Sequence, residues 1–370
     1  MTTPAATDAS APAATVPERR SDAGARLPAV DVFRGIATVA VVAHHLTGLA
    51  LRHAEAGSTL SLGLAVINRS LHFVVPAFVF MTALVLTRSA MRRLDLGKYY
   101  AARIRTALLP YLLWTVLYVL FRVVTRQDPP SVLADPERWQ VWLQYGKGYF
   151  HLYFLLIVLQ FYLVLPLLLP IWRRRWPFLG VLVAAFALQF LVFWLNRTGV
   201  LNFRFPGTMA LWYIPSIALG MYFGANAGLF EALWARWRWW FVGAAVLALL
   251  WYVPVSVALL NGARVSSVTY SAANWTFTAA AVLALFGLAQ VLAPFQTRWR
   301  GALVYLGTVS LQIYLLHPAV LWFLERVGFP GSPALFLVVL AVYGLIALGI
   351  PILIARLLEG KALSRWLFGR

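Results

Sequence analysis

Long apolar runs separated by short polar segments dominate the sequence. The runs lie near residues 30–51, 64–87, 104–124, 149–171, 177–195, 208–226, 238–260, 270–292, 302–324 and 334–356. Most of them have about the 20 residues that a helix needs to cross a bilayer. The pattern therefore predicts an all-α, polytopic membrane bundle of about ten transmembrane helices.

The two ends of the chain differ from this apolar middle. Residues 1–27 are rich in Ala, Pro, Thr and Ser and have no apolar period, which is typical of a disordered tail. Residues 28–357 form the expected transmembrane domain. Residues 358–370 are expected to form a short basic tail.

The distribution of Lys and Arg predicts the orientation of the helices. Cytoplasmic loops of membrane proteins carry an excess of these residues. If the N-terminus is cytoplasmic and the spans alternate, most basic residues fall in the inside segments, with groups at 88–105 and 173–175. Both termini are therefore predicted to lie in the cytoplasm.

Composition supports a membrane protein and excludes several other classes. Apolar residues make up 62% of the chain and charged residues 12%, whereas a soluble domain has about 45–50% and 25%. The net charge of +19 does not indicate nucleic-acid binding, because the basic residues are scattered in short clusters between apolar runs. The sequence has no cysteine, which excludes thiol nucleophiles and thiolate metal sites.

Ionisable residues inside the predicted spans are candidates for function, because a charge inside a bilayer is costly. These residues are Asp31, Arg34, His44, His45, Arg69, His72, His151 and His317. Only one of them is a carboxylate. This scarcity disfavours a proton- or sodium-coupled transporter, which typically uses buried carboxylates as relays.

The first span places three of these residues on one stripe. An α-helix turns about 100° per residue, so Arg34 and His45, eleven residues apart, differ by only about 20° in direction and by roughly 16 Å along the axis. Asp31 can pair with Arg34 at i,i+3. One helix face is therefore expected to present a guanidinium near the cytoplasmic surface and an imidazole in the outer half.

The predicted topology also places the histidines of the spans at one level. His44, His45, His72, His151 and His317 all fall in the outer half of the membrane. Such a group could bind a metal, but no carboxylate or thiolate lies near and no i,i+4 His pair exists. We therefore expect no metal and favour a hydrogen-bonded polar site with one catalytic base.

Five segments of the chain carry a family resemblance. Four of them match a pattern: D-x-x-R-G-x-A with Arg-x10-His at 31–45, R-x6-P-Y at 103–111, H-L-x-F followed by Q-F-Y-x3-P at 151–166, and S-x-x-I-Y-L-x-H-P at 310–318. The fifth, Val75-Pro76-Ala77-Phe78-Val79-Phe80-Met81-Thr82-Ala83, resembles V-P-x-F-F-F-x-S-G. At these segments the chain resembles the acyltransferase-3 family of bacterial membrane acyltransferases. The third and fourth segments resemble the branch of the poly-N-acetylglucosamine intercellular-adhesin modification proteins.

The resemblance implies transfer of an acyl group, usually acetyl, from acyl-CoA (acetyl-CoA) to a hydroxyl of a cell-envelope glycan or a lipid-linked saccharide. It implies a multi-pass protein of the bacterial cytoplasmic membrane. His45 is then the base or the carrier of the acyl group, because imidazole is the usual base near neutral pH. Asp31 orients Arg34. The other expected contacts are Arg34, Arg103 and Arg105 with the CoA phosphates, and His72, His151, Tyr153, Gln160, Tyr162 and His317 with the acceptor.

Two positions depart from the family pattern. Thr82-Ala83 replaces the common Ser-Gly, so a close backbone approach on this helix is not assured. The frequent R-x-x-R at the start of the third span is here Arg103-Ile104-Arg105, so the second arginine does not align with the family position.

Other functional classes remain open from the residues alone. A transporter or flippase for a glycan or lipid intermediate would also have aromatic-rich spans and polar residues in the outer half. An intramembrane protease or metal-dependent enzyme is disfavoured, since the chain lacks a serine nucleophile motif and a carboxylate–histidine ligand set. The sequence does not indicate whether the protein is a monomer or an oligomer.

Overall fold

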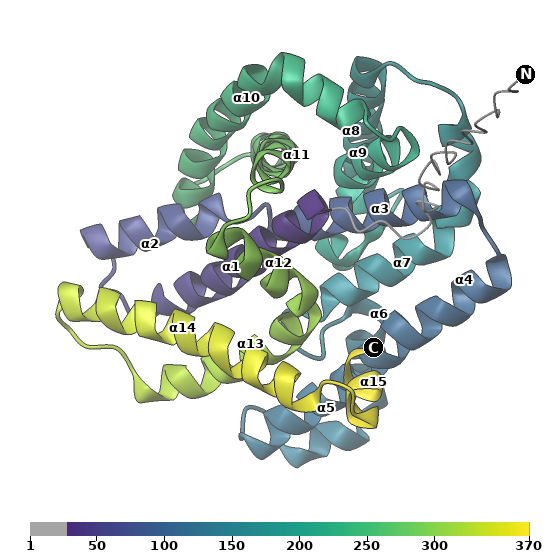
Figure 1. The fold of residues 1–370 in the computed structure, drawn as a ribbon. Helices are drawn as coiled ribbons and strands as arrows, with labels where there is room; N and C mark the ends of the chain where they lie inside the picture. The colour runs from purple at the N-terminus through teal and green to yellow at the C-terminus, as the bar shows by residue number, and fades with distance from the viewer. Residues whose placement is uncertain (1–27, 370) are drawn as a thin grey trace, which may run out of the picture.

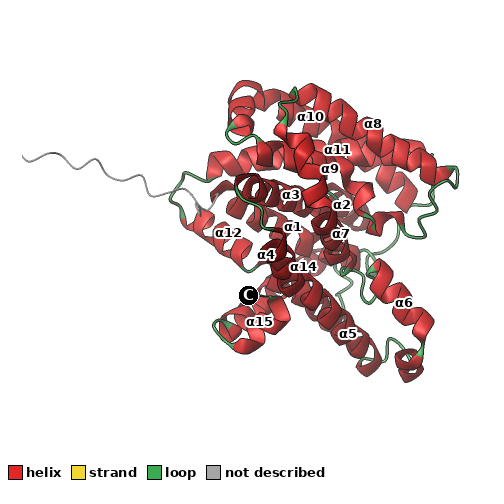
Figure 2. Cartoon of the chain, turned by 90° about the vertical axis from the view of Figure 1, so that its right-hand side faces the viewer, coloured by secondary structure: helices red, strands yellow, loops and turns green. Residues whose placement is uncertain are grey.

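A computed structural model describes residues 28–369, so the predicted tail at 1–27 lies outside the described residues. All regular secondary structure in the described part is helical (Figure 1 and Figure 2). In chain order the helices are α1 (Pro28–Ala50), α2 (Thr59–Ser70), α3 (Val74–Arg92), α4 (Leu96–Arg103), α5 (Leu109–Val124), α6 (Pro136–Tyr145), α7 (Tyr153–Leu168), α8 (Phe178–Arg197), α9 (Ile214–Ala225), α10 (Leu229–Leu260), α11 (Ser267–Leu292), α12 (Arg298–Thr308), α13 (Ser310–Val327), α14 (Pro333–Leu358) and α15 (Ala362–Phe368). Short 3-10 or π turns are η1 (Ile104–Leu108), η2 (Pro130–Ala134), η3 (Leu169–Arg173), η4 (Pro206–Thr208) and η5 (Ala210–Tyr213).

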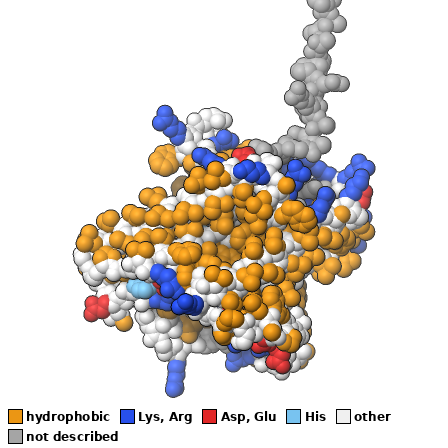
Figure 3. Space-filling view, turned by 90° about the horizontal axis from the view of Figure 1, so that it is seen from below, with side chains coloured by type: hydrophobic (Ala, Val, Ile, Leu, Met, Phe, Trp, Pro, Cys, Tyr) orange, Lys and Arg blue, Asp and Glu red, His pale blue; other side chains and the backbone are white. Residues whose placement is uncertain are grey.

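The helices have the length and surface of a membrane protein. Among the described residues, eight helical segments are long and apolar enough to cross a bilayer, or nine if the bent pair α12–α13 counts as one span. Hydrophobic side chains cover a broad band of the face in Figure 3, and Lys and Arg side chains gather along its edges. The expected all-helical, multi-pass bundle is confirmed, whereas the count of ten spans and the cytoplasmic termini stay predictions.

Three expected spans are interrupted in the structure. The segment near 208–226 is divided into η5 and the short helix α9, because Pro215 cannot donate the backbone hydrogen bond that would join them. The segment near 302–324 bends by 79° between α12 and α13. The segment near 64–87 is interrupted by a turn at residues 71–73, between α2 and α3.

Helix α1 is at the centre of the bundle. It packs against α2, α3, α11, α12, α13 and α14 (Figure 1). Val32, Phe33 and Ala37 on this helix have no exposed surface. Because α1 also carries the predicted Arg34 and His45, the fold surrounds both side chains with protein.

Helices α3 and α9 are in close contact through small residues. Gly220 and Gly224 lie four residues apart on α9, the spacing at which small residues let two membrane helices approach. A Cβ atom at Gly220 would clash with the backbone carbonyl of Phe80 and with Ala83, and one at Gly224 with the carbonyl of Leu84. The close approach that Thr82-Ala83 left uncertain therefore exists, and α9 supplies the glycines.

This contact predicts a large effect of one methyl group. Gly220→Ala is expected to destabilise the protein by about 1–3 kcal/mol, because the neighbouring atoms are backbone atoms that cannot move aside. Gly243→Ala on α10 is the matched control, since nothing lies within 4 Å of a Cβ there. Thermal unfolding in detergent should show a lower midpoint for Gly220→Ala alone. Equal midpoints for the two variants would contradict this account.

The end of the chain is more ordered than a tail. After α14 the chain forms α15, which packs on α5. Trp114 Nε1 donates a hydrogen bond of 2.7 Å to the carbonyl of Leu367, and Phe368 is 1% exposed. Within the segment predicted at 358–370 as a short basic tail, Ala362–Phe368 therefore form a helix that is held against α5 by the contact of Phe368 with Trp114.

Candidate functional site

Five histidines contact one another in a row within the bundle. Ring centroids are 5.0 Å apart between His72 and His44, 5.2 Å between His44 and His45, 5.3 Å between His45 and His317, and 6.2 Å between His317 and His151. Helices α1 and α13, the turn after α2 and the loop before α7 supply them. The structure thus brings together the five histidines that the sequence places at one level.

The rings of this cluster contact one another by stacking and by their edges. Among residues 28–369, no three His, Asp or Glu side chains are grouped as metal ligands. The ring of His45 is instead stacked on that of His317 at an angle of 26°. The arrangement is that of a polar site in which single imidazoles differ in their hydrogen bonds.

His72 is held at both ring nitrogens. Arg69 Nη1 lies 3.1 Å from His72 Nε2, and His72 Nδ1 lies 2.6 Å from the Tyr252 hydroxyl. A guanidinium can only donate, so Nε2 accepts and the ring proton of the neutral imidazole is at Nδ1, from which it is donated to Tyr252. The lone pair of His72 is therefore occupied. His72 is suited to positioning and not to proton abstraction.

His317 has one nitrogen held and one nitrogen without a partner. Its Nδ1 donates to the carbonyl of Ile313 at 2.7 Å, which leaves Nε2 unprotonated. This Nε2 atom and both ring nitrogens of His151 are buried and have no hydrogen-bond partner in the protein. Buried polar atoms are normally paired, so these nitrogens are candidates for contact with a substrate.

His45 is placed in the row by contacts with neighbouring rings. It contacts His317 on one side and Phe150 on the other, with ring centroids 4.9 Å apart in the second pair. Its ring lines two neighbouring cavities. His44, in contrast, is tied to α2, since its Nδ1 lies 3.1 Å from the carbonyl of Asn68. An imidazole that faces open space on two sides can meet two reactants.

The predicted arginines of the first and third spans meet in one cavity. The arginine cavity, of about 320 Å³, is lined by residues that include Arg34, Thr82, Arg103, Phe154, Tyr162, Ser310, Tyr314 and Phe368. Asp31 pairs with Arg34 at 3.4 Å, which confirms the predicted i,i+3 pair. Arg103 lies over the rings of Tyr99 and Tyr162. Two guanidinium groups at one cavity suit a phosphate-bearing ligand.

Two further cavities lie between the arginine cavity and the outer end of the histidine row, each sharing wall residues with its neighbour. The histidine cavity, of about 170 Å³, shares Phe154 and Tyr314 with the arginine cavity and is also lined by His44, His45, His72, His151 and Tyr153. The wide cavity, of about 870 Å³, shares His44, His45 and His72 with the histidine cavity. The predicted residues Arg34 and His45 therefore face a succession of neighbouring cavities and not lipid.

Two predicted site residues lie elsewhere. Arg105 lines a separate cavity of about 540 Å³, together with Arg365 and Trp366 of the α15 region, which we call the α15 cavity. Gln160 uses both ends of its amide to hold the backbone before α9: Nε2 donates to the carbonyl of Thr208 and Oε1 accepts from the amide of Ala210. Gln160 therefore holds the backbone before α9, and Arg105 does not line the cavity that Arg34 lines.

Three residues of the site were not predicted from the sequence: Tyr314, Tyr252 and Phe150. Tyr314 lies between two cavities and donates a hydrogen bond to the carbonyl of His151. It stands within the S-x-x-I-Y-L-x-H-P segment, and this was the signal that could have found it. Tyr252 and Phe150 had no such signal, because nothing in the sequence distinguishes them from the other aromatic residues of the apolar runs.

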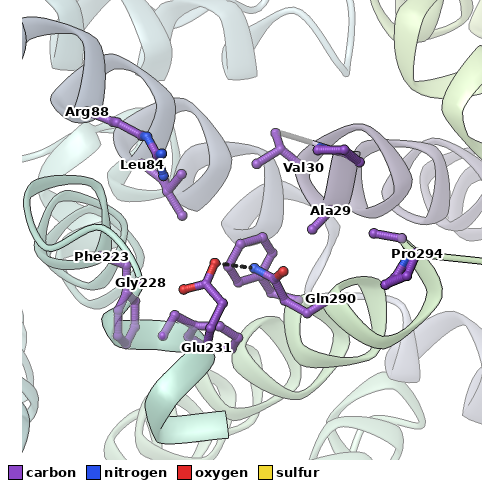
Figure 4. A pocket seen from close by; sticks show the side chains of 13 residues that line it. Ala29, Val30, Leu84, Arg88, Phe223, Gly228, Glu231, Gln290 and Pro294 are labelled. Carbon is purple, nitrogen blue, oxygen red and sulfur yellow. Dashed lines mark hydrogen bonds between the residues drawn. The ribbon is translucent and has the colours of Figure 1, made fainter. Parts of the chain in front are cut away.

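Another cavity lies away from the histidines, where α1, α3, α10 and α11 meet. Figure 4 shows Gln290 beside Glu231, to which its side chain donates a hydrogen bond of 3.1 Å, with Arg88 on α3 across the cavity. This cavity, of about 320 Å³, shares no lining residue with the arginine, histidine or wide cavity. It therefore forms no part of the candidate site.

The fold and the site define a multi-pass helical membrane protein whose chemistry is enclosed in the bundle around α1. The sequence matches the family profile described as an acyltransferase domain over residues 27–356, and the chain therefore belongs to the acyltransferase-3 family. The predicted family is confirmed, and the protein is a membrane acyltransferase.

Curated relatives support the predicted branch of the family. The chain is 25% identical to a probable poly-β-1,6-N-acetyl-D-glucosamine export protein of Staphylococcus aureus (strain MRSA252), over 80% of this chain and 82% of the relative. The protein of the same name from strain MSSA476 is 24% identical over the same shares. No solved structure matches the chain significantly.

Proposed function

We propose that the protein transfers an acyl group, usually acetyl, from acyl-CoA to a hydroxyl of a cell-envelope glycan or a lipid-linked saccharide. The family supports the reaction class, and the names of the relatives support a polysaccharide as the acceptor. We place the protein in the bacterial cytoplasmic membrane with both termini inside. The arginine cavity then faces the cytoplasm, where acyl-CoA is available, and the wide cavity faces outward.

One observation carries this proposal. Arg34 and His45 are on the same face of the same buried helix, and the histidine cavity, which His45 lines, shares wall residues with both the arginine cavity and the wide cavity. A donor whose phosphates bind at Arg34 can extend its acyl arm past Phe154 and Tyr314 to His45. An acceptor can reach the same imidazole through the wide cavity.

The chemistry follows from this geometry. His45 removes the proton of the acceptor hydroxyl while the hydroxyl oxygen attacks the thioester carbonyl of the donor. The imidazolium then returns the proton to the CoA sulfur as the C–S bond breaks. In the alternative route the imidazole itself takes the acyl group from CoA and passes it to the acceptor hydroxyl. In both routes His151, which lines the histidine cavity, can hold the acceptor through its unpartnered nitrogens, while His317 stacks on His45.

A direct experiment tests the reaction. The purified protein in vesicles receives radiolabelled acetyl-CoA on the arginine side and an oligosaccharide acceptor on the other side. Transfer of label to the acceptor is the expected result. In cells, mass spectrometry of envelope glycans should show an acyl mass that a deletion strain has lost. An unchanged glycan and lipid profile in an expressing strain would overturn the proposal.

A second candidate function is movement of a glycan or lipid intermediate across the membrane without acyl transfer. The word export in the names of the relatives favours it, and the 870 Å³ wide cavity offers room for a saccharide. The two functions separate in one strain: if His45→Ala abolishes glycan acylation while the amount of exported glycan stays the same, the protein is the transferase and not the exporter.

The hydrogen bond between His72 and Tyr252 yields a prediction for the transferase. Tyr252→Phe removes the hydroxyl that accepts the Nδ1 proton of His72, so His72 loses one of its two hydrogen bonds. We expect kcat to fall about tenfold, because the loss of one hydrogen bond costs about 1.4 kcal/mol. Tyr222→Phe is the control, because the Tyr222 hydroxyl donates to the carbonyl of Trp176 and lines none of the three site cavities. Equal rates for both variants would show that His72 needs no support.

A further inference from the structure

Charge is distributed unevenly in the wide cavity. Four basic side chains line it, Arg52, Arg69, Arg122 and Lys147, whereas Glu325 is the only carboxylate among its lining residues. A cavity for a neutral sugar would need hydrogen-bonding groups but no excess of cations. The balance of charge therefore carries information about the ligand.

Two of these cations are already neutralised by the protein. Arg52 lies 2.8 Å from Glu325, which also accepts from His53 at 3.0 Å. Arg122 lies 2.6 Å from Asp128, a carboxylate outside the lining. Each of these two cations therefore has a carboxylate of the protein as its partner.

The other two cations have no carboxylate. Among residues 28–369, Arg69 and Lys147 form no ion pair. Arg69 donates to the neutral ring of His72, and its Nε atom is buried without a partner. Lys147 lies over the ring of Phe205, with Nζ 4.6 Å from the centroid. Arg69 is partly buried, which is costly for a cation unless an anion meets it, whereas Lys147 is exposed and free to reach a ligand in the cavity.

Resting on the proposed function, we propose that the acceptor saccharide bears a negatively charged group, a phosphate or a carboxylate, which binds to Arg69 and Lys147 in the wide cavity. Arg69 holds the imidazole of His72, in the same row as His45. The anionic group would therefore bind close to the place where the hydroxyl reacts, and it would fix which hydroxyl of the sugar reaches His45. Phe150 and Trp322 in the lining offer flat surfaces for the sugar rings.

The test compares acceptors that differ in one charge. The full-length protein in phosphatidylcholine vesicles is given acetyl-CoA and one of three matched oligosaccharides: a neutral one, its uronate form and its phosphorylated form. We expect a higher kcat/KM for the charged acceptors, and a preference that weakens as salt is added. Equal values for the neutral and charged forms would overturn the inference.

Variants assign the effect to the cavity. Lys147→Gln is expected to lower the ratio of kcat/KM between charged and neutral acceptors about fivefold, in the range of an exposed ion pair. Lys147→Glu is expected to lower it further. Arg264→Gln, in the exposed loop between α10 and α11, is the matched control and should leave the ratio unchanged. An unchanged ratio in both Lys147 variants would overturn the assignment.

Two further measurements distinguish a lipid headgroup from the acceptor as the source of the anion, and separate a failure of this inference from a failure of the proposed function. If the neutral acceptor reaches full activity once phosphatidylglycerol is added to the vesicles, a lipid headgroup occupies the site and the inference is wrong. Binding of the labelled oligosaccharides to the protein without donor is measured in parallel. Binding of the uronate or phosphate form that depends on Lys147, in the absence of any acyl transfer, would uphold the anion site and reject the proposed reaction.

Discussion

Replacing His45 with alanine is expected to lower acyl transfer by about 10²–10⁴-fold, the contribution of a well-placed general base or nucleophile. Two other imidazoles in the row are engaged by the protein. The lone pair of His72 is occupied by Arg69. His317 is fully buried, and its Nδ1 is committed to Ile313. The initial rate of label transfer from radiolabelled acetyl-CoA measures the loss.

The chain offers a matched control for this variant. His53 lies outside the row and pairs with Glu325 near the surface. His53→Ala removes the same side chain and should keep the rate within a few-fold of the unchanged protein, because surface substitutions have small effects. A His45→Ala protein that folds as judged by its unfolding midpoint and retains full transfer would show that His45 is neither the base nor the acyl carrier.

The sequence allowed most of the fold to be predicted, because apolar run length and helix period are local properties. The interruptions were not predictable in the same way. Residues 71–73 are Leu-His-Phe, and Pro76, in the first turn of α3, was the one local sign that a new helix begins inside this apolar run. Irregular backbone at membrane depth is tolerated where protein or a cavity surrounds it. At this turn the structure supplies Tyr252 and Arg69 for His72, and these are contacts that no local pattern encodes.

The candidate site could be predicted only in part, for a related reason. Histidines are rare in membrane spans, so each of them was visible in the sequence, and their common level followed from the topology. The hydrogen-bond partners of these histidines could not be predicted, because they can lie far away in the chain: Tyr252 is 180 residues from His72. Gln160 illustrates the opposite error. Its place in a motif suggested contact with the acceptor, whereas both ends of its amide are used by the backbone of a neighbouring loop.

The arginines make a second prediction with a large expected effect. Arg34→Gln or Arg103→Gln is expected to raise the KM for acyl-CoA about 10–100-fold, because each variant loses a charge-assisted hydrogen bond to phosphate worth about 1.5–3 kcal/mol. Arg105→Gln should raise it much less, since Arg105 lines the α15 cavity and not the arginine cavity. Steady-state kinetics with varied acyl-CoA measure all three values.

A shortened donor shows whether these arginines act on phosphate. Acyl-pantetheine keeps the thioester but has no phosphate, so Arg34→Gln should leave its KM unchanged while it raises that of acyl-CoA. A rise for both donors would mean that Arg34 holds the cavity open together with Asp31 and does not bind phosphate. If Arg105→Gln raises the KM for acyl-CoA as much as Arg34→Gln does, the phosphates lie in the α15 cavity. The acyl arm would then have to pass Thr106, the residue that lines both cavities, before it reaches the histidines.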